Sequence, residues 1–68
     1  MTETQKVTLA WIACHPWRSC EECCQAIKYK ADISWQEANN AHLYLRRSRR
    51  IKKRGKGANT VWAASEDV

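Results

Sequence analysis

Apolar residues recur at helical spacing in three stretches of this chain, the first near the N-terminus. Thr2 with Gln5 three residues later is a typical helix start, and Pro16 disfavours helix in the residue before it. Leu9 and Ile12 widen the apolar side. Four residues at i, i+3, i+4 and i+7 define the expected buried face: Val7, Ala10, Trp11 and Cys14. The pattern predicts a first helix over residues 3–14.

Capping boxes of the S-x-x-E type predict where the next two helices begin. Ser19 opens a helix over residues 20–28, and Ser34 opens a helix over residues 34–47, each with a glutamate three residues later. The expected buried face of the former helix consists of Cys20, Cys23, Cys24 and Ile27. The expected buried face of the latter consists of Ala38, Ala41, His42 and Leu45. A histidine on such a face is expected to be a hydrogen-bonded core or boundary residue.

The residues after the third helix predict a β-hairpin over residues 49–63. Apolar Ile51 lies before a loop that contains two glycines, and Val61 and Trp62 follow the loop. Glycine supplies the positive φ that such a loop needs. We expect Trp62 to be the residue of the hairpin that packs inward.

Composition and charge fit one small domain with an anionic partner. The 68 residues carry a formal charge of +5, and we expect a single domain over residues 1–68 with a frayed tail at 65–68. Eight of the eleven residues from Arg46 to Lys56 are basic, and no acid occurs from residue 38 to residue 65. A charge run is most often a solvated tract. Here apolar and turn residues bound the run, which favours a basic hairpin.

The side of the third helix opposite its apolar stripe carries two amides and an arginine. Such groups read base edges in a major groove. This side consists of Gln36, Asn40, Leu43, Tyr44 and Arg47. An ordinary surface helix is the alternative interpretation. The adjoining basic run favours the nucleic-acid interpretation.

The order helix, helix, short link, helix, hairpin resembles the winged helix–turn–helix family of DNA-binding domains. The resemblance covers about residues 7–62. In that family an apolar residue of the recognition helix is followed six residues later by another that starts the wing, and Leu45 and Ile51 occupy these places. A glycine usually lies between them in the family, whereas this chain has Arg46-Arg47-Ser48-Arg49-Arg50. The implied fold is α+β and mainly α: a three-helix winged helix–turn–helix with a C-terminal basic β-hairpin wing.

Three segments are also similar to small enterobacterial or phage transcription regulators of the carnitine-operon activator type. The segments are residues 9–12 (LAWI), 33–34 (IS) and 44–51 (YLRRSRRI). Those regulators are winged-helix transcription factors. The resemblance therefore implies a bacterial or phage regulator.

The resemblance implies a division of labour among thirteen DNA-binding residues. Four residues of the recognition helix would face bases, with amides bonding adenine and Leu43 touching a thymine methyl group: Gln36, Asn40, Leu43 and Arg47. Asn39 and Tyr44 of the same helix are also expected to bind DNA. Basic residues of the helix end and wing would contact phosphates, which positions the protein without reading sequence. These are Arg46, Arg49, Arg50, Lys52, Lys53, Arg54 and Lys56.

The cysteines allow a rival interpretation. Cys20-x-x-Cys23 has the spacing of half a zinc site, to which Cys14 or His15 could add a ligand. No second half-site follows, and free cysteine behaves as a small buried hydrophobe, so we expect no metal and no cofactor. A redox-sensing regulator is a further alternative, and a disulfide among Cys14, Cys20, Cys23 and Cys24 would need an oxidising compartment.

The function that we expect is sequence-specific binding of duplex DNA by a small bacterial or phage transcription regulator. No catalytic triad spacing, phosphate-cradling glycine loop or transmembrane stretch is present, and no signal peptide is recognised. We therefore expect a cytoplasmic protein that is not an enzyme. Its regulation would come from a homodimer, a protein partner or occupancy of DNA. The alternatives are a protein-interaction module of the antirepressor or inhibitor type, and an RNA-binding basic domain.

Overall fold

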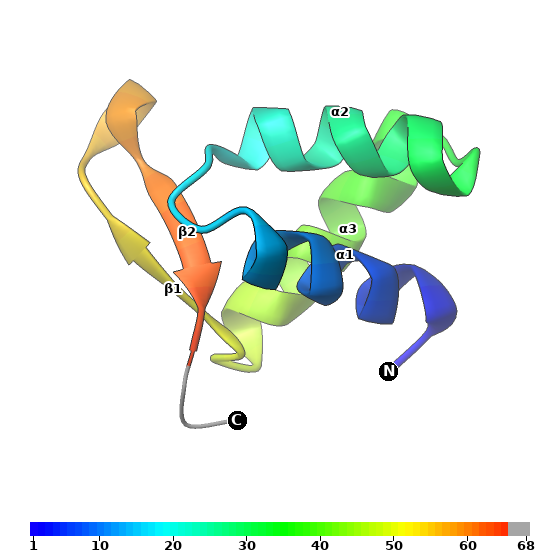
Figure 1. Ribbon diagram of the computed structural model, residues 1–68, viewed down its shortest axis with the longest axis horizontal. Helices are drawn as coiled ribbons and strands as arrows, with labels where there is room; N and C mark the ends of the chain where they lie inside the picture. Colours follow the sequence, from blue (N-terminus) through cyan, green and yellow to red (C-terminus); the bar gives the residue numbers. More distant parts are fainter. Residues whose placement is uncertain (66–68) are drawn as a thin grey trace.

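Three helices followed by a two-stranded antiparallel hairpin make up this protein (Figure 1). The computed structural model describes residues 1–65. The helices are α1 (Glu3–Cys14), α2 (Cys20–Ala31) and α3 (Trp35–Arg47). The strands are β1 (Ile51–Arg54) and β2 (Val61–Ala64), joined through a short 3-10 turn, Gly57–Asn59. This is the three-helix, C-terminal hairpin architecture that the sequence predicts. The expected tail, apart from Ser65, lies outside the described residues.

Side-chain caps fix the start of each helix where the sequence predicts it. The hydroxyls of Ser19 and Ser34 accept hydrogen bonds from the third amide of α2 and α3, at 3.1 and 3.2 Å. In α1 the box is reciprocal, because Thr2 also donates its backbone N–H to the Gln5 side chain at 2.8 Å. Each cap satisfies an amide that has no partner within the helix, which contributes about 1 kcal/mol.

Helix α2 is longer than the sequence predicts. The expected end at residue 28 is wrong, since the helix continues to Ala31. Asp32 ends it in the left-handed conformation (φ 53°) and donates its N–H to the Lys28 carbonyl. Aspartate tolerates this conformation better than most residues, and the lysines of the last turn interact favourably with the helix dipole. The link to α3 is therefore shorter than expected.

Only part of the face predicted for α1 is buried: Val7 and Trp11 are half-buried against the core and Ile12 is buried. Ala10 and Cys14 are exposed, whereas Thr8 and Ile12 are only 1% exposed. Thr8 is tolerated in the core because its hydroxyl donates to the Thr4 carbonyl at 2.7 Å. Thr8 and Ile12, at i and i+4, therefore form the centre of the buried face. A search for apolar residues at helical spacing does not identify Thr8, because threonine is polar.

Helices α2 and α3 bury the faces that the sequence predicts. Ala38, Ala41, His42 and Leu45 are all buried, as are Cys23, Cys24 and Ile27, while Cys20 is half-buried. Together with Ile12 and Ile51 they form the core. Burial of each large aliphatic side chain contributes roughly 1.5–3 kcal/mol. The core fixes how α3 is turned and therefore which side chains it presents to solvent.

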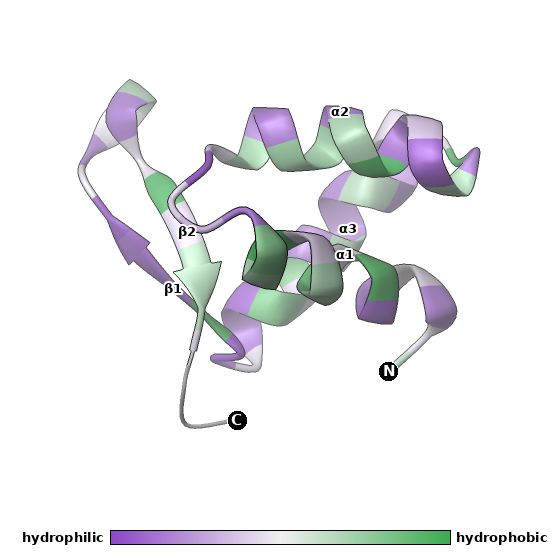
Figure 2. Ribbon diagram, viewed as in Figure 1, coloured by the Kyte–Doolittle hydropathy of each residue, from purple (hydrophilic) through white to green (hydrophobic). Residues whose placement is uncertain are grey.

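The hairpin also pairs with the connection between α1 and α2, through a single bridge between Arg18 and Trp62. Strand β1 pairs with β2 from Ile51↔Ala64 to Arg54↔Val61. On the other edge of β2, Trp62 donates to the Arg18 carbonyl at 2.9 Å and accepts from the Trp17 amide at 2.8 Å. Figure 2 shows the contrast between the strands: β1 is mostly hydrophilic and β2 is mostly apolar. The hairpin is thus anchored through β2, which leaves the basic strand at the outer edge.

Glycine is required at one position of the hairpin loop. Gly55 has φ +90°, and a Cβ built there would lie 2.4 Å from the Asn59 carbonyl oxygen. Only glycine fits such a turn without displacing backbone. The strands span residues 51–64 rather than the predicted 49–63, because residues 48–50 form the turn that ends α3.

Candidate nucleic-acid interface

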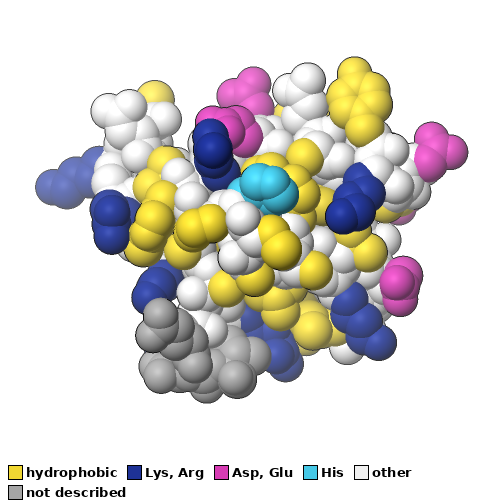
Figure 3. All heavy atoms as spheres, in the orientation of Figure 1, with side chains coloured by type: hydrophobic (Ala, Val, Ile, Leu, Met, Phe, Trp, Pro, Cys, Tyr) yellow, Lys and Arg dark blue, Asp and Glu magenta, His cyan; other side chains and the backbone are white. Residues whose placement is uncertain are grey.

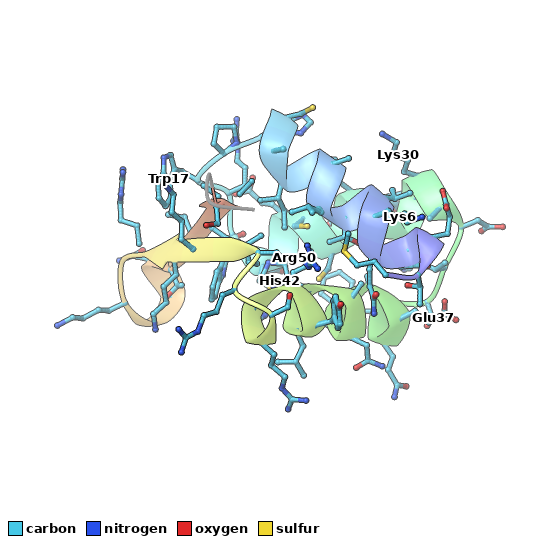
Figure 4. The ribbon with its side chains drawn as sticks, turned by 90° about the horizontal axis from the view of Figure 1, so that it is seen from below. Lys6, Trp17, Lys30, Glu37, His42 and Arg50 are labelled. Atoms are coloured by element: carbon cyan, nitrogen blue, oxygen red, sulfur yellow. The ribbon has the colours of Figure 1, made fainter. Side chains whose placement is uncertain are left out.

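The outer face of α3 carries a narrow stripe of exposed polar side chains. Gln36, Asn40 and Arg47 are exposed, and Leu43 between them is half-buried. At 100° per residue these four positions fall within an arc of about 60° and extend about 16 Å along the axis. Figure 4 shows side chains projecting from this face of α3, away from α1. The stripe has the length and polarity of a helix face that contacts base edges.

The structure divides the predicted DNA-binding residues into two groups. Five of the thirteen are half-buried: Asn39, Leu43, Tyr44, Arg46 and Arg50. Asn39 donates its side-chain amide to the Trp35 carbonyl at 3.0 Å, and Tyr44 packs against the core. The other eight are exposed: Gln36, Asn40, Arg47, Arg49, Lys52, Lys53, Arg54 and Lys56. Sequence periodicity does not separate these groups, because the burial of side chains at the edges of a helix face depends on the segments that pack beside them.

Arg46 is the clearest case of a predicted phosphate ligand that points inward. Its Nε donates to His42 Nδ1 at 2.8 Å, and its Nη2 donates to Cys20 Sγ at 2.9 Å. The guanidinium lies 5.0 Å from the centre of the Trp62 ring, which His42 contacts edge-on at 5.3 Å. We call these four residues the inner cluster. It joins α2, α3 and β2.

His42 is the buried centre of the inner cluster, as the sequence predicts for a core residue. It is 0% exposed, and Nδ1 accepts the bond from Arg46. Its other ring nitrogen, Nε2, is buried without a hydrogen-bond partner among residues 1–65. Figure 4 shows His42 and Arg50 in the middle of the molecule, between α1 and α3. The cluster is therefore part of the packing that holds the hairpin against α3.

The turn between α3 and β1 uses an arginine where the winged-helix pattern usually has a glycine. Arg49 adopts a left-handed φ of 59°. The Ser48, Arg49 and Arg50 amides all return to carbonyls of the last turns of α3, at 2.9–3.1 Å. A left-handed non-glycine residue costs about 1–2 kcal/mol. The three amide bonds offset that cost, and the Arg49 side chain stays exposed.

The basic residues of β1 lie on both faces of the hairpin. Arg54 stacks over the Trp17 ring at 3.9 Å, and Lys52 lies 5.9 Å from the same ring. Lys53 points to the opposite face, where it borders a hollow together with Arg46 and Trp62. The cation–π contact with Trp17 gives the Arg54 side chain a fixed position.

Charge is distributed unevenly over the molecule. In Figure 3 the acidic side chains lie over α2 and the far end of the helices, and the hairpin carries basic side chains and none that is acidic; further basic side chains lie over the helices. Glu37, in the first turn of α3, is the only acid of that helix. One ion pair, Arg18–Glu22 at 3.6 Å, is solvent-exposed and contributes little. Glu37 is thus the one acid among the residues of α3 and the two strands.

The cysteines and histidines do not assemble into a metal-binding group in the part of the chain that the structure describes. No three His, Cys, Asp or Glu side chains among residues 1–65 converge to hold a metal ion. His15 instead stacks on Trp11 with ring centres 4.4 Å apart, and Cys14 is exposed. All four cysteines are free thiols.

The three thiols of α2 differ sharply in acidity. The hydrogen bond with the Cys24 thiol lowers the pKa of Cys20 most. Burial raises this pKa, and His42 and the Arg46 charge lower it further. The net result is a pKa of about 4. Burial, with a smaller effect of the Cys20 charge, raises the pKa of Cys23 to about 12. The bond to Cys20 and burial also raise the pKa of Cys24. Cys20 is therefore the thiolate of this group at neutral pH.

Two features of this surface have little or no signal in the sequence. The pairing of Arg18 with Trp62 has no local signal, because a single bridge needs no alternating pattern. The inner cluster had a partial signal: His42 and Arg46 are four residues apart on one side of a predicted helix, which allows their side chains to meet. This spacing does not show that Cys20 and Trp62 also belong to the inner cluster.

Searches against protein-family models, curated proteins and solved structures gave no match. Within residues 1–65, none of the helices is long and apolar enough to cross a membrane. The functional argument therefore depends on the arrangement of the exposed side chains.

Proposed function

We propose that this protein binds duplex DNA sequence-specifically and acts as a small transcription regulator of the winged helix–turn–helix type. The outer face of α3 would enter the major groove, and the basic hairpin would lie along the phosphate backbone. One observation carries the proposal: an exposed stripe of amides and arginine on α3 adjoins a hairpin rich in exposed lysine and arginine.

The chemistry of the stripe supports base contacts. Asn40 and Gln36 can each bond adenine through two hydrogen bonds, and Arg47 can bond guanine in the same manner. Leu43 is half-buried at the middle of the stripe and can contact a thymine methyl group. These four side chains are spaced along three helical turns, which corresponds to a few successive base pairs.

The exposed basic residues beyond the stripe support phosphate contacts. Five remain after the half-buried arginines are set aside: Arg49, Lys52, Lys53, Arg54 and Lys56. If all five neutralise phosphates, log K falls with log salt at a slope of about −4.5. Affinity then decreases about 500-fold between 50 and 200 mM salt.

The test is a salt titration of binding to mixed-sequence duplex DNA, repeated with duplex RNA and single-stranded RNA. Duplex DNA should bind most tightly, with a slope near the expected value. Asn40→Ala should then relax the preference at one base pair by about 1–3 kcal/mol in a site-selection experiment, with the salt slope unchanged.

A charge-matched pair of variants distinguishes DNA binding by the outer face of α3 from general electrostatic attraction between the protein and DNA. Arg47→Glu should abolish measurable binding at 200 mM salt, whereas Lys30→Glu should reduce it only slightly. Lys30 lies on α2, on the opposite side of the molecule from the outer face of α3 (Figure 4). Equal losses for both variants, or equal weak binding to all three polymers, would contradict the proposal and favour an acidic protein or RNA as the partner.

A further inference from the structure

Cys20 occupies an accessible position at the start of a helix. It is the first residue of α2, where Ser19 is the cap, and its side chain is half-buried. It borders an open hollow of about 460 Å³ between α2 and the hairpin, whose charged or aromatic walls include Glu21, Arg46, Lys53 and Trp62. A small solute can therefore reach the sulfur from solvent. The positive end of the helix dipole also favours a thiolate at this position.

The groups around the sulfur are arranged for a thiolate with a second thiol beside it. Arg46 Nη2 donates to Cys20 Sγ at 2.9 Å, which is a charge-assisted contact. Cys24 Sγ lies 3.8 Å from Cys20 Sγ, and the Asn39 side-chain oxygen lies 3.9 Å away. Cys24 is 0% exposed, so its sulfur has no direct contact with solvent. The geometry places one reactive sulfur at the surface and one protected sulfur behind it.

From this arrangement we propose that Cys20 is a peroxide-reaction site and that Cys24 is its resolving thiol. The Cys20 thiolate attacks the O–O bond of hydrogen peroxide, which forms Cys20 sulfenic acid and releases hydroxide. The Cys24 thiol sulfur then displaces the sulfenic hydroxyl, which leaves as water, and a Cys20–Cys24 disulfide forms. Two electrons pass from the thiol pair to the peroxide, and a dithiol reductant restores both thiols.

Closing this disulfide requires a small movement of α2. Residues at i, i+4 in a helix have Cα atoms about 6 Å apart, inside the range that a disulfide spans. Their Cβ atoms stand about 5–6 Å apart and must approach to about 4 Å. The first turn of α2 must therefore shift, which separates Cys20 from Arg46. Cys23, at i+3, is buried, and the sulfur that contacts Cys20 is that of Cys24, so Cys23 remains a thiol in this scheme.

Acidic pH gives the sharpest discrimination between Cys20 and an ordinary thiol. At pH 5 an ordinary thiol of pKa 9 is about 0.01% ionised, whereas Cys20 is mostly thiolate. The low pKa also reduces intrinsic nucleophilicity, by about 100- to 300-fold for a shift of this size. At pH 5, Cys20 should therefore react with peroxide about 30- to 100-fold faster than an ordinary thiol. At pH 7 the two effects nearly cancel, so a measurement at neutral pH would not reveal the site.

The experiment exposes the reduced full chain to hydrogen peroxide at pH 5, blocks remaining thiols with N-ethylmaleimide, and maps tryptic peptides by mass spectrometry. Cys20 should be lost about 30- to 100-fold faster in the folded protein than in urea. The peptide of residues 19–28 should carry a Cys20–Cys24 disulfide with Cys23 alkylated. Exposed Cys14, on a separate peptide, is the internal comparison and should stay reduced.

Two variants complete the test without relying on a change in fold. Cys24→Ser should halt the reaction at a Cys20 sulfenic acid, which dimedone traps. Cys14→Ser should leave the rate and the product unchanged. Equal oxidation of Cys14 and Cys20, a rate for Cys20 that is no faster folded than in urea, or a disulfide to Cys23 in place of Cys24 would each overturn the proposal. None of these outcomes depends on whether the protein binds DNA.

Discussion

The outer and inner sides of the last turns of α3 differ in what their basic residues do. Arg47 is exposed on the outer side, while its neighbour Arg46 bonds His42 and Cys20 and lies over Trp62. The two arginines are adjacent and lie in the same basic run of the sequence. Their environments differ because a helix turns 100° per residue, which directs one guanidinium to solvent and the other to α2 and β2. A basic run therefore contains both solvent-exposed arginines and arginines bonded within the fold.

The largest expected effect contrasts two leucines on the two sides of α3. Leu45 is 0% exposed, so Leu45→Ala should lower the free energy of unfolding by about 2–5 kcal/mol through lost burial and a cavity. Leu43 is half-buried on the outer side, and Leu43→Ala should cost about 1 kcal/mol or less. Urea titration followed by tryptophan fluorescence measures both. Similar losses for the two variants would contradict the assigned orientation of α3.

The next effect contrasts the two adjacent arginines under the same substitution. Arg46→Met should destabilise by about 1–3 kcal/mol, because His42 Nδ1 loses its partner in the core. Arg47→Met should change stability by no more than about 0.5 kcal/mol and should weaken DNA binding. Thermal unfolding and DNA titration of both variants test the contrast. If Arg46→Met left stability unchanged, the inner cluster would not hold the hairpin to α3.

A third contrast is the pH dependence that Cys20 gives to the inner cluster. The pKa of Cys20 falls from 9.0 to about 4 on folding, so its stabilising contribution is complete above pH 9 and is lost as the pH falls toward 4. The difference in unfolding free energy between wild type and Cys20→Ser should therefore increase steadily from pH 5 to pH 8. Urea titrations at four pH values measure it. A difference that stays flat over this interval would mean that Arg46 is not paired with a thiolate.

The smallest expected effect has opposite signs at two neighbouring arginines. Arg49→Gly should stabilise the protein by about 0.5–1 kcal/mol, because glycine adopts φ near 60° without strain but gains freedom in the unfolded chain. Arg47→Gly, at the last residue of α3 and without a left-handed φ to relieve, should destabilise by up to about 1 kcal/mol, the cost of glycine in a helix interior. Both remove one exposed positive charge, so the pair separates backbone strain from charge. Calorimetric melting temperatures are sufficient to measure it.

Much of the helical architecture could be predicted because its signals are local. Ser19 and Ser34 cap α2 and α3 as the S-x-x-E spacing indicates, and the buried faces of both helices follow the apolar period. The prediction failed in part for α1, where the buried Thr8 is satisfied by the Thr4 carbonyl and so behaves as a core residue. It also failed for the end of α2, where Asp32 supplies a left-handed cap.

The candidate interface was predicted less completely. The outer stripe with Gln36, Asn40 and Arg47 is exposed as expected. Asn39 and Arg46 flank that stripe and turn toward α2, where Asn39 lies near Cys20. Whether a side chain at the edge of a helix face is buried or exposed depends on the residues that pack beside it. Those residues come from elsewhere in the chain.

The sequence by itself determined where the helices begin, which faces of α2 and α3 are buried, and where positive charge accumulates, because capping, periodicity and charge act over three or four residues. The tertiary structure alone decided that Arg18 pairs with Trp62 and that Arg46 bonds a cysteine 26 residues away. It also decided that Cys20 is half-exposed beside a buried partner thiol. These features depend on surfaces that meet only when the chain has folded, so no local pattern encodes them.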